Sequence, residues 1–266
     1  MKKVLIPTKL DKVAREILAA NGNYEVVQEE SEDLEGLAKQ NPDAYGLIVR
    51  SNKVTPEIID SLPQLKVIVR AGAGYNTIDT KYARQKGVDV MNTPGANSNA
   101  VAEEVIALML ADARHVVQGD PSVRSGKWEK KKFMGREIAS KTVGIVGLGN
   151  IGRLVAKRLS GFDVKLLGYD PVISSERATD MNVELVDLAT LFSRSDYISL
   201  HIPENDDTRG MVNAALLAGA KHGATIVNCA RAGVDDEEAL REIIDYKVAF
   251  AQGYLFSEPR LARPAA

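Results

Sequence analysis

The fold of this chain is decided by the stretch Thr142-Val143-Gly144-Ile145-Val146-Gly147-Leu148-Gly149-Asn150-Ile151-Gly152. It opens with a short apolar run that favours a β-strand and continues with three glycines in the spacing G-x-G-x-x-G. Apolar residues then recur with helical period at Ile151, Leu154, Val155 and Leu159. A strand, a glycine-rich turn and a helix in this order predict the phosphate-binding turn of a doubly wound α/β fold.

The three glycines of the turn have separate physical tasks. Gly147 permits the tight turn from strand to helix, Gly149 lets the backbone approach a pyrophosphate, and Gly152 lets the helix pack closely on the strand. The N-terminus of the helix offers free N–H groups and the positive end of its dipole to the phosphates. The alternative is a glycine-rich turn that binds nothing.

An acidic residue is expected at the end of the next strand, and Asp170 meets this expectation. It stands eighteen positions beyond Gly152 and closes the predicted strand from Val164 to Tyr169. A carboxylate here accepts hydrogen bonds from a ribose 2′-hydroxyl and repels a 2′-phosphate, so the pattern favours NAD over NADP. The alternative is that Asp170 is a solvated turn residue.

On both sides of this stretch, short apolar runs alternate with segments of helical period. The predicted strands are Val4 to Ile6, Tyr24 to Val27, Leu47 to Val49, Leu65 to Val69, Val88 to Met91, Thr142 to Val146, Val164 to Tyr169, Tyr197 to His201, Ala224 to Cys229 and Phe250 to Phe256. Such alternation indicates βαβ units on parallel sheets that are buried on both faces. Because Asn92-Thr93-Pro94-Gly95 interrupts the pattern before a longer helix from about Ser98, we expect two domains, residues 1–96 and 97–266.

The composition is that of a globular protein and excludes several function classes. Of 266 residues, 45% are apolar, and 34 Lys and Arg stand against 36 Asp and Glu, which gives a formal charge of −2. No global positive field therefore attracts nucleic acid or an acidic membrane surface. The single cysteine, Cys229, excludes an intrachain disulfide and fits the reducing cytoplasm, and the sequence has no Cys/His cluster typical of a metal site. We expect neither an export signal nor a membrane span.

Residues 118–136 are polar and basic with one tryptophan, Trp128, and we expect them to form an exposed arm. A tryptophan on such an arm packs either on a partner subunit or against its own domain, and the sequence leaves both alternatives open. The first alternative would suit a homodimer.

Several segments beyond the glycine turn resemble the D-isomer-specific 2-hydroxyacid dehydrogenases, and within that family the D-3-phosphoglycerate dehydrogenases. They extend over residues 45–240 and are Val49 to Thr55, Val69 to Asn76, Asn92 to Glu103, Leu200 to Pro203 and Ile226 to Gly233. The resemblance implies a flavodoxin-like substrate domain, a Rossmann domain that holds NAD, and an active site in the cleft between them. It also implies oxidation of a D-2-hydroxy acid, with D-3-phosphoglycerate as the leading substrate, a place in serine biosynthesis, and a homodimer.

The same resemblance assigns catalytic and phosphate-binding roles. Arg231 matches the family's catalytic arginine, and a planar guanidinium there can hold the carboxylate and carbonyl of a 2-keto acid. Arg50, Ser51 and Lys53 would supply donors for a substrate phosphate. The alternative is that these three residues form only a solvated basic turn. Arg70 would then serve to orient the loop.

Further positions match the family's backbone cradle and cofactor site. The amides around Ala73 and Gly74 match the cradle for the substrate carboxylate. His201 is expected to border the cofactor rather than to transfer protons, and Val101 belongs either to the cofactor site or to the core. The expected cofactor-binding residues are Asn97, Val101, Gly147, Gly149, Asn150, Ile151, Gly152, Asp170, His201, Pro203, Thr208, Cys229 and Ala230.

Hydride transfer to a ketone needs a proton donor, and the family uses a histidine whose pKa is raised by a glutamate. Glu258, in Phe256-Ser257-Glu258-Pro259, matches that glutamate, whereas no Pro-His segment follows before Ala266. We therefore expect a chain that is truncated at its C-terminus. The alternatives to an active dehydrogenase of D-3-phosphoglycerate are an NAD-binding protein impaired in catalysis and a glyoxylate or hydroxypyruvate reductase.

Overall fold

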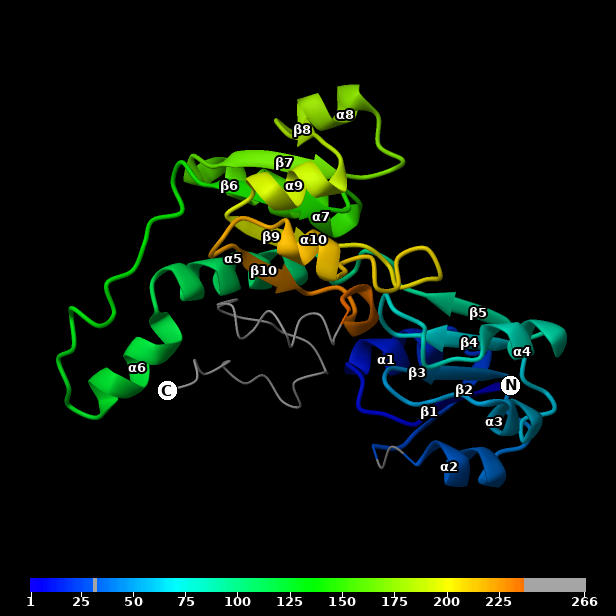
Figure 1. Cartoon of the computed structure of the whole chain (residues 1–266). Helices are drawn as coiled ribbons and strands as arrows, with labels where there is room; N and C mark the ends of the chain where they lie inside the picture. Colours follow the sequence, from blue (N-terminus) through cyan, green and yellow to red (C-terminus); the bar gives the residue numbers. More distant parts are fainter. Residues whose placement is uncertain (31–32, 237–266) are drawn as a thin grey trace. The chain divides into compact units, whose positions relative to one another are not determined.

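A computed structural model describes residues 1–30 and 33–236 of the chain. The chain divides into two compact units, Met1–Asn97 and Ser98–Ala266, and the boundary expected from the sequence lies one residue earlier. Each unit contains one parallel sheet (Figure 1). The predicted strand from Phe250 to Phe256 and the candidate Glu258 lie outside the described residues.

The first unit is built on a five-stranded parallel sheet with the order β2-β1-β3-β4-β5. Its strands are β1 (Lys2–Ile6), β2 (Tyr24–Gln28), β3 (Gly46–Val49), β4 (Val67–Arg70) and β5 (Asp89–Asn92). Its helices are α1 (Lys12–Ala20), α2 (Leu34–Gln40), α3 (Pro56–Asp60) and α4 (Thr80–Gln85). This strand order is that of flavodoxin, so the expected flavodoxin-like architecture is confirmed.

The core of the first unit forms where its central strands meet the helices. Leu5, Leu47 and Ile68, one each from β1, β3 and β4, are fully buried in one apolar cluster with residues of α2 and α3. Because both faces of a parallel sheet are covered, its strands appear in the sequence as short apolar runs. Helix α1 differs, since Val13 and Ile17 on it are exposed.

The second unit carries another five-stranded parallel sheet, with the order β10-β9-β6-β7-β8. Its strands are β6 (Thr142–Val146), β7 (Lys165–Tyr169), β8 (Glu184–Leu185), β9 (Tyr197–Leu200) and β10 (Thr225–Asn228). Its helices are α5 (Ser98–Ala113), α6 (Val116–Arg124), α7 (Asn150–Leu159), α8 (Ser175–Asp180), α9 (Leu188–Arg194) and α10 (Ala214–Ala218), with short 3₁₀ turns η1 (Ser160–Phe162) and η2 (Ala232–Val234). Counted within the unit, the order is 3-2-1-4-5, which is the Rossmann order, and the point where it reverses lies between β6 and β9.

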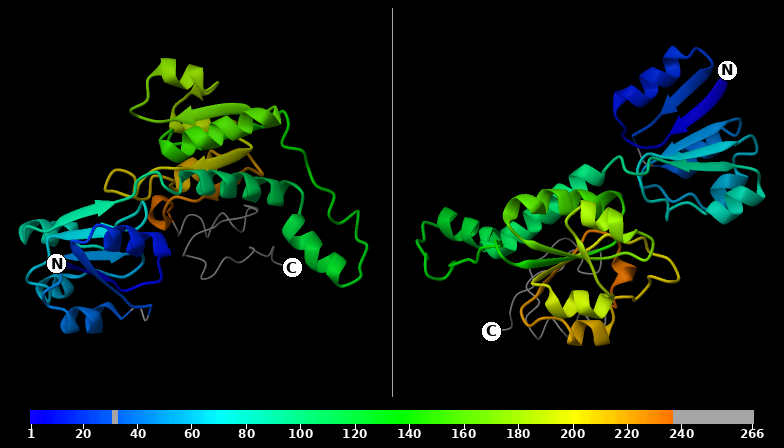
Figure 2. Two further views of the ribbon diagram at one scale, coloured as in Figure 1. Left: turned by 180° about the vertical axis from the view of Figure 1, so that it is seen from behind. Right: turned by 90° about the horizontal axis from the view of Figure 1, so that it is seen from above.

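Helices cover both faces of this second sheet, as the green to orange ribbon in Figure 2 shows. On one face, Val143 and Ile145 of β6 are buried with residues of α5 and α7. On the other face, Val146 is buried with Leu191 and Phe192 of α9. The carboxyl ends of β6, β7, β9 and β10 therefore meet at one edge of a sheet whose faces are closed to ligands.

The segment between α5 and β6 differs in part from the prediction. The sequence suggested a polar, exposed arm and predicted no helix there, but Val116–Arg124 form helix α6, which contains Pro121. Trp128 and Met134 beyond the helix are 84% and 80% exposed. Trp128 is therefore not packed against the described part of its own unit, and the alternative of a contact with a partner subunit stays a prediction. We continue to refer to residues 118–136 as the arm.

The arm returns to the sheet at Arg136. The guanidinium donates from Nη2 to Asp112 Oδ2 at 2.7 Å and from Nε to the Tyr197 hydroxyl at 2.9 Å. Nη2 also donates to Thr225 Oγ1 at 2.9 Å, which in turn donates to Asp112. Tyr197 and Thr225 are the first residues of β9 and β10, so this polar cluster lies at the amino edge of the sheet.

Among residues 1–30 and 33–236, none of the helices has the length and apolar character that a membrane crossing requires.

Candidate active site

The glycine-rich turn has the geometry that its sequence predicts. Gly147 has a φ of +91°, and a Cβ at this position would lie 2.7 Å from the carbonyl oxygen of His201. A Cβ on Gly152 would collide with the carbonyl oxygen of Gly147, so helix α7 can approach β6 only with glycine here. A Cβ on Gly149, in contrast, would meet nothing within 4 Å. Space is thus left open where the backbone must approach a ligand.

Asp170 directly follows β7 and is held by backbone amides. Its Oδ2 accepts from Leu148 N at 2.8 Å, and its Oδ1 accepts from Val172 N at 2.9 Å and from Ile173 N at 3.1 Å. The carboxylate therefore joins the glycine turn to the loop after β7 and stays in one orientation. A sequence reading alone does not show this bracing, because it depends on the two loops meeting in space.

A pocket of about 480 Å³ lies over the turn and this carboxylate. It is lined by Leu148, Gly149, Arg153, Asp170, Val172, Ile173, Arg177, Asp180 and Met181. The first N–H groups of α7 have no acceptor within the helix and are available to an anion. An open glycine, helical N–H groups and a fixed carboxylate beside a pocket fit the pyrophosphate and ribose of a dinucleotide. Arg153 and Arg177 were not among the predicted cofactor residues.

His201 follows β9 at the same edge of the sheet. Its Nε2 is hydrogen-bonded to Ser199 Oγ at 2.7 Å, and its Nδ1 is buried with no partner among the described residues. Burial lowers the pKa of His201 to about 4. The imidazole is therefore neutral at pH 7, which is consistent with a bordering position and unsuited to proton transfer at that pH.

The loop after His201 is shaped by its own side chains. Thr208 Oγ1 donates to the carbonyl oxygen of Pro203 at 2.5 Å, and Thr208 N donates to Asn205 Oδ1 at 3.0 Å. Thr208 is buried, so its hydroxyl is committed to the backbone that presents Pro203. Its predicted contact with cofactor stays a prediction.

Cys229, Ala230 and Arg231 follow β10, which is the last strand of this sheet among the described residues. Burial, together with the nearby Glu104 carboxylate, raises the pKa of the Cys229 thiol to about 12, so the thiol stays protonated. Arg231 is exposed, and its Nη1 donates to the carbonyl oxygen of Ala230 at 2.8 Å. The second sheet thus brings the glycine turn, Asp170, His201 and Arg231 to one edge.

In the first unit, the predicted substrate residues stand at the carboxyl ends of two neighbouring strands. Arg50, Ser51 and Lys53 follow β3 and are exposed. Ala73 and Gly74 follow β4, and their N–H groups donate no backbone hydrogen bond within the described part of the chain. Exposed cations beside free amides are suited to bind an anion.

Arg70 connects these two segments. Its Nε donates to the carbonyl oxygen of Arg50 at 3.1 Å, and its guanidinium lies where a Cβ on residue 72 would stand. Asn92 adds a second tie, because its Nδ2 donates to the carbonyl oxygen of Ala73 at 2.7 Å. The alternative in which Arg70 orients the loop agrees with these contacts.

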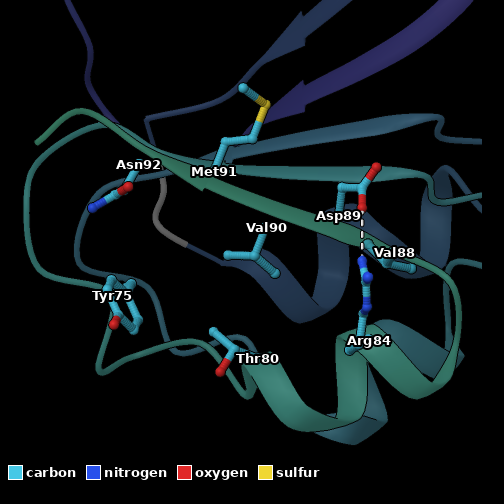
Figure 3. Close-up of a pocket in the computed structure, with 8 residues that line it drawn as sticks. All are labelled: Tyr75, Thr80, Arg84, Val88, Asp89, Val90, Met91 and Asn92. Carbon is cyan, nitrogen blue, oxygen red and sulfur yellow. Dashed lines mark hydrogen bonds and ion pairs between the residues drawn. The ribbon is translucent and has the colours of Figure 1, made fainter.

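The first unit also contains a pocket of about 400 Å³ beside its edge strand β5 (Figure 3). It is lined by Tyr75, Thr80, Arg84, Val88, Asp89, Val90, Met91 and Asn92. Arg84 and Asp89 form an ion pair at 3.5 Å across it, and both side chains are largely exposed. The pocket includes none of the predicted site residues.

Of the remaining candidates, Asn97 is exposed at the end of the first unit, and Val101 is half-buried in the first turn of α5. Asn150 and Ile151 open α7 beside Gly149. Their contacts with a cofactor stay predictions.

A Rossmann sheet with this turn and this acidic residue defines a dinucleotide-binding protein that is suited to NAD. A family model described as "D-isomer specific 2-hydroxyacid dehydrogenase, NAD binding domain" matches residues 106–254. The chain therefore belongs to the D-isomer-specific 2-hydroxyacid dehydrogenase family, and the resemblance seen in its motifs is confirmed, as is NAD as its cofactor.

Relatives with different names resemble the chain to a similar extent. It is 45% identical over 252 residues to the hydroxypyruvate reductase of Thermotoga maritima, which covers 94% of this chain and 81% of the relative. It is 43% identical over 243 residues to the D-3-phosphoglycerate dehydrogenase of Archaeoglobus fulgidus, which covers 91% of this chain and 46% of the relative. The chain thus spans less than half the length of that second relative.

Solved structures agree with the family assignment. The apo structure of D-lactate dehydrogenase from Escherichia coli superposes with a TM-score of 0.83 at 29% identity, covering 95% of this chain and 81% of that one.

Proposed function

We propose that this chain oxidises a D-2-hydroxy acid to the 2-keto acid with NAD, and that D-3-phosphoglycerate is its leading substrate. The observation that carries the proposal is Arg231, an exposed guanidinium at the carboxyl end of β10, on the same sheet edge as the NAD-binding turn. Ligands of open α/β sheets bind at that edge, near the point where the strand order reverses.

Bound NAD would accept a hydride at C4 of its nicotinamide. The protein's part is to hold the acid so that its C2–H bond can break with its electron pair while the C2 hydroxyl loses its proton, which is released to solvent. The guanidinium of Arg231 would donate two hydrogen bonds, one to the carboxylate and one to the C2 oxygen, and these would fix the position of the reacting carbon. The amides of Ala73 and Gly74 stay predicted donors for a substrate carboxylate, on the family resemblance alone. Glu258 keeps its proposed role as the match to the glutamate that raises the pKa of the family's histidine.

Replacement of Arg231 by Lys tests this role. Lysine keeps the charge but loses the two-pronged contact, so kcat/KM for D-3-phosphoglycerate should fall about tenfold to a hundredfold. NADH binding, measured by fluorescence, should stay unchanged. Arg194→Lys is the matched control, because Arg194 forms a surface ion pair with Glu184. Unchanged turnover in Arg231→Lys would contradict the proposal.

Tight NADH binding by the unaltered chain without any turnover would favour the catalytically impaired alternative.

The substrate phosphate is assigned to Arg50, Ser51 and Lys53. Lys53→Ala should lower kcat/KM for D-3-phosphoglycerate about tenfold or more, because a charge-assisted hydrogen bond is lost, and should leave the unphosphorylated D-glycerate little affected. Lys81→Ala, an exposed lysine of α4, is the control. An unchanged preference for the phosphorylated acid would rule out this phosphate site.

A second candidate is reduction of hydroxypyruvate. The observation in its favour is the Thermotoga maritima relative of that name, 81% of whose length is covered. Rates with hydroxypyruvate and 3-phosphohydroxypyruvate as competing substrates decide between the two, and a clear preference for the unphosphorylated acid would favour the reductase.

A homodimer joined through the arm is also proposed. Val123, Trp128 and Met134 leave a concentration of apolar surface on this segment, of the kind that subunit interfaces cover. Serine biosynthesis and a cytoplasmic location stay predictions from the resemblance and from the single cysteine.

A further inference from the structure

We propose that Asn228 is a positioning residue for Arg231, and that it acts by fixing the backbone on both sides of that arginine. The inference rests on the proposed role of Arg231 in holding the substrate carboxylate. Asn228 is the last residue of β10 and is 9% exposed. It is therefore too deep to be a surface contact for a ligand and close enough in sequence to control the loop.

The side chain of Asn228 makes three hydrogen bonds to that loop. Its Oδ1 accepts from Ala230 N at 2.9 Å, and its Nδ2 donates to the carbonyl oxygen of Arg231 at 3.0 Å. Nδ2 also donates to Asp235 Oδ2 at 2.6 Å. One amide group thus holds the N–H that precedes Arg231 and the carbonyl of Arg231 itself. Only Asn or Gln offers a donor and an acceptor of this kind on one side chain.

Asp235, which accepts a hydrogen bond from Asn228 Nδ2, is itself held in place. Asp235 is 8% exposed and forms a parallel bridge with Val212. The backbone around it is tied to the same segment, because Val212 N donates to Val234 O at 3.2 Å and Asp236 N donates to Val212 O at 2.9 Å. Asn228 therefore connects the end of β10 to a part of the loop that cannot shift freely.

The loop is also confined from outside. A Cβ on Gly233 would lie 2.5 Å from Glu204 Oε1, and that carboxylate is held by Arg209 Nη2 at 2.7 Å. Gly210 N donates to Gly233 O at 2.9 Å. The described part of the Arg231 loop is thus held at Ala230, Arg231, Gly233 and Asp235, while the arginine side chain itself remains exposed.

The physical consequence concerns the geometry of the guanidinium. A misplacement of about 1 Å in a group that orients a substrate costs about a hundredfold in rate. Without the Asn228 amide, the peptide that carries Arg231 loses both of its side-chain ties. We expect kcat/KM to fall about tenfold to a hundredfold while the affinity for NADH stays within about twofold of the unaltered chain.

The test uses Asn228→Ala and the exchanged double variant Asn228→Asp/Asp235→Asn. The exchange retains a hydrogen bond between positions 228 and 235 and an acceptor for Ala230 N–H, but it removes the donor to the Arg231 carbonyl. We therefore expect it to fold even if Asn228→Ala does not, and it should still lose at least about tenfold in kcat/KM. Asn213→Ala is the control, because Asn213 caps α10 through Leu216 N at 3.1 Å and should cost stability without changing kcat/KM of the folded protein.

A double-variant cycle with Arg231→Ala separates positioning from mere stability. If Asn228 acts through Arg231, adding Asn228→Ala, or the exchange, to Arg231→Ala should lower kcat/KM no further. Additive losses would overturn the inference, as would a full rate in the exchanged variant while Arg231→Ala is impaired. Wild-type turnover in Arg231→Ala would instead overturn the proposed function, and the inference with it.

Discussion

The imidazole of His201 lies at the same sheet edge as the glycine turn, yet burial has removed its capacity to exchange protons at neutral pH. Its pKa of about 4 leaves it uncharged, and Ser199 Oγ holds its Nε2. Cys229 shows the same effect in the other direction, since burial and Glu104 raise the pKa of the thiol to about 12. Two residue types that often react are inert here, whereas Arg231 stays exposed and charged at this edge.

The depressed pKa of His201 predicts a pH dependence of stability. Between about pH 6.5 and pH 4 the unfolded chain binds a proton at His201 that the folded chain does not, so the free energy of unfolding falls as the pH falls through this window. The full effect is on the order of 3 kcal/mol. Urea unfolding at pH 7, 5.5 and 4.5 should show a weaker decline for His201→Gln, which retains a polar group near Nε2. Equal declines in both proteins would contradict the prediction.

Asn228 and Asp170 show why the candidate site was only partly predictable at the level of residues. Asp170 follows a strand at a fixed distance from the glycines, so its position could be read from spacing. Its contact with Leu148 N, and the bonds of Asn228 to the Arg231 loop, depend on how segments meet in space. No local pattern marks such contacts.

At the scale of elements, the turn between β6 and α7 offers a matched pair of substitutions. Gly152→Ala places a Cβ against the carbonyl oxygen of Gly147 and should cost several kcal/mol or prevent folding, because strand and helix must move apart. Gly149→Ala meets nothing within 4 Å and should leave the free energy of unfolding within about 1 kcal/mol, while it weakens NADH binding at least about tenfold by filling the approach to the pyrophosphate. Urea unfolding and NADH fluorescence measure the two effects. Equal NADH affinity in Gly149→Ala and the unaltered chain would show that the ligand does not approach there.

Most strands and several helices were predictable for a simple reason. A parallel strand is buried on both faces and is short, so β1, β3, β6 and β9 read as compact apolar runs. Helix α6 was missed because its sequence is polar and includes Pro121, which usually marks a helix end. Strand β8 has only two residues, Glu184 and Leu185, and is too short to produce a periodic signal.

At the scale of the whole molecule, the arm predicts the state of association. If Val123 and Trp128 lie in a dimer interface, replacing both by Glu buries charge there and should shift sedimentation from two chains to one, of 28.8 kDa. Ile17→Glu, on an exposed apolar position of α1, is the control and should leave the mass unchanged. Sedimentation of the unaltered chain as a single copy would contradict the prediction, as would an unchanged dimer in the double variant.

The apolar clusters described for the two units are separate: one includes Leu5 and Ile68, and the others include Val143 and Val146. The residues proposed to recognise the substrate phosphate belong to the unit with the first cluster. The residues around Asp170, which are proposed to recognise the coenzyme, belong to the unit with the other clusters. A lineage can therefore change the acid it accepts through the loops of one core while inheriting the coenzyme site intact. Such descent would produce relatives of similar sequence that act on different acids. Two relatives fit this expectation: they share more than two fifths of this sequence, and one is named a reductase and the other a dehydrogenase of a different acid.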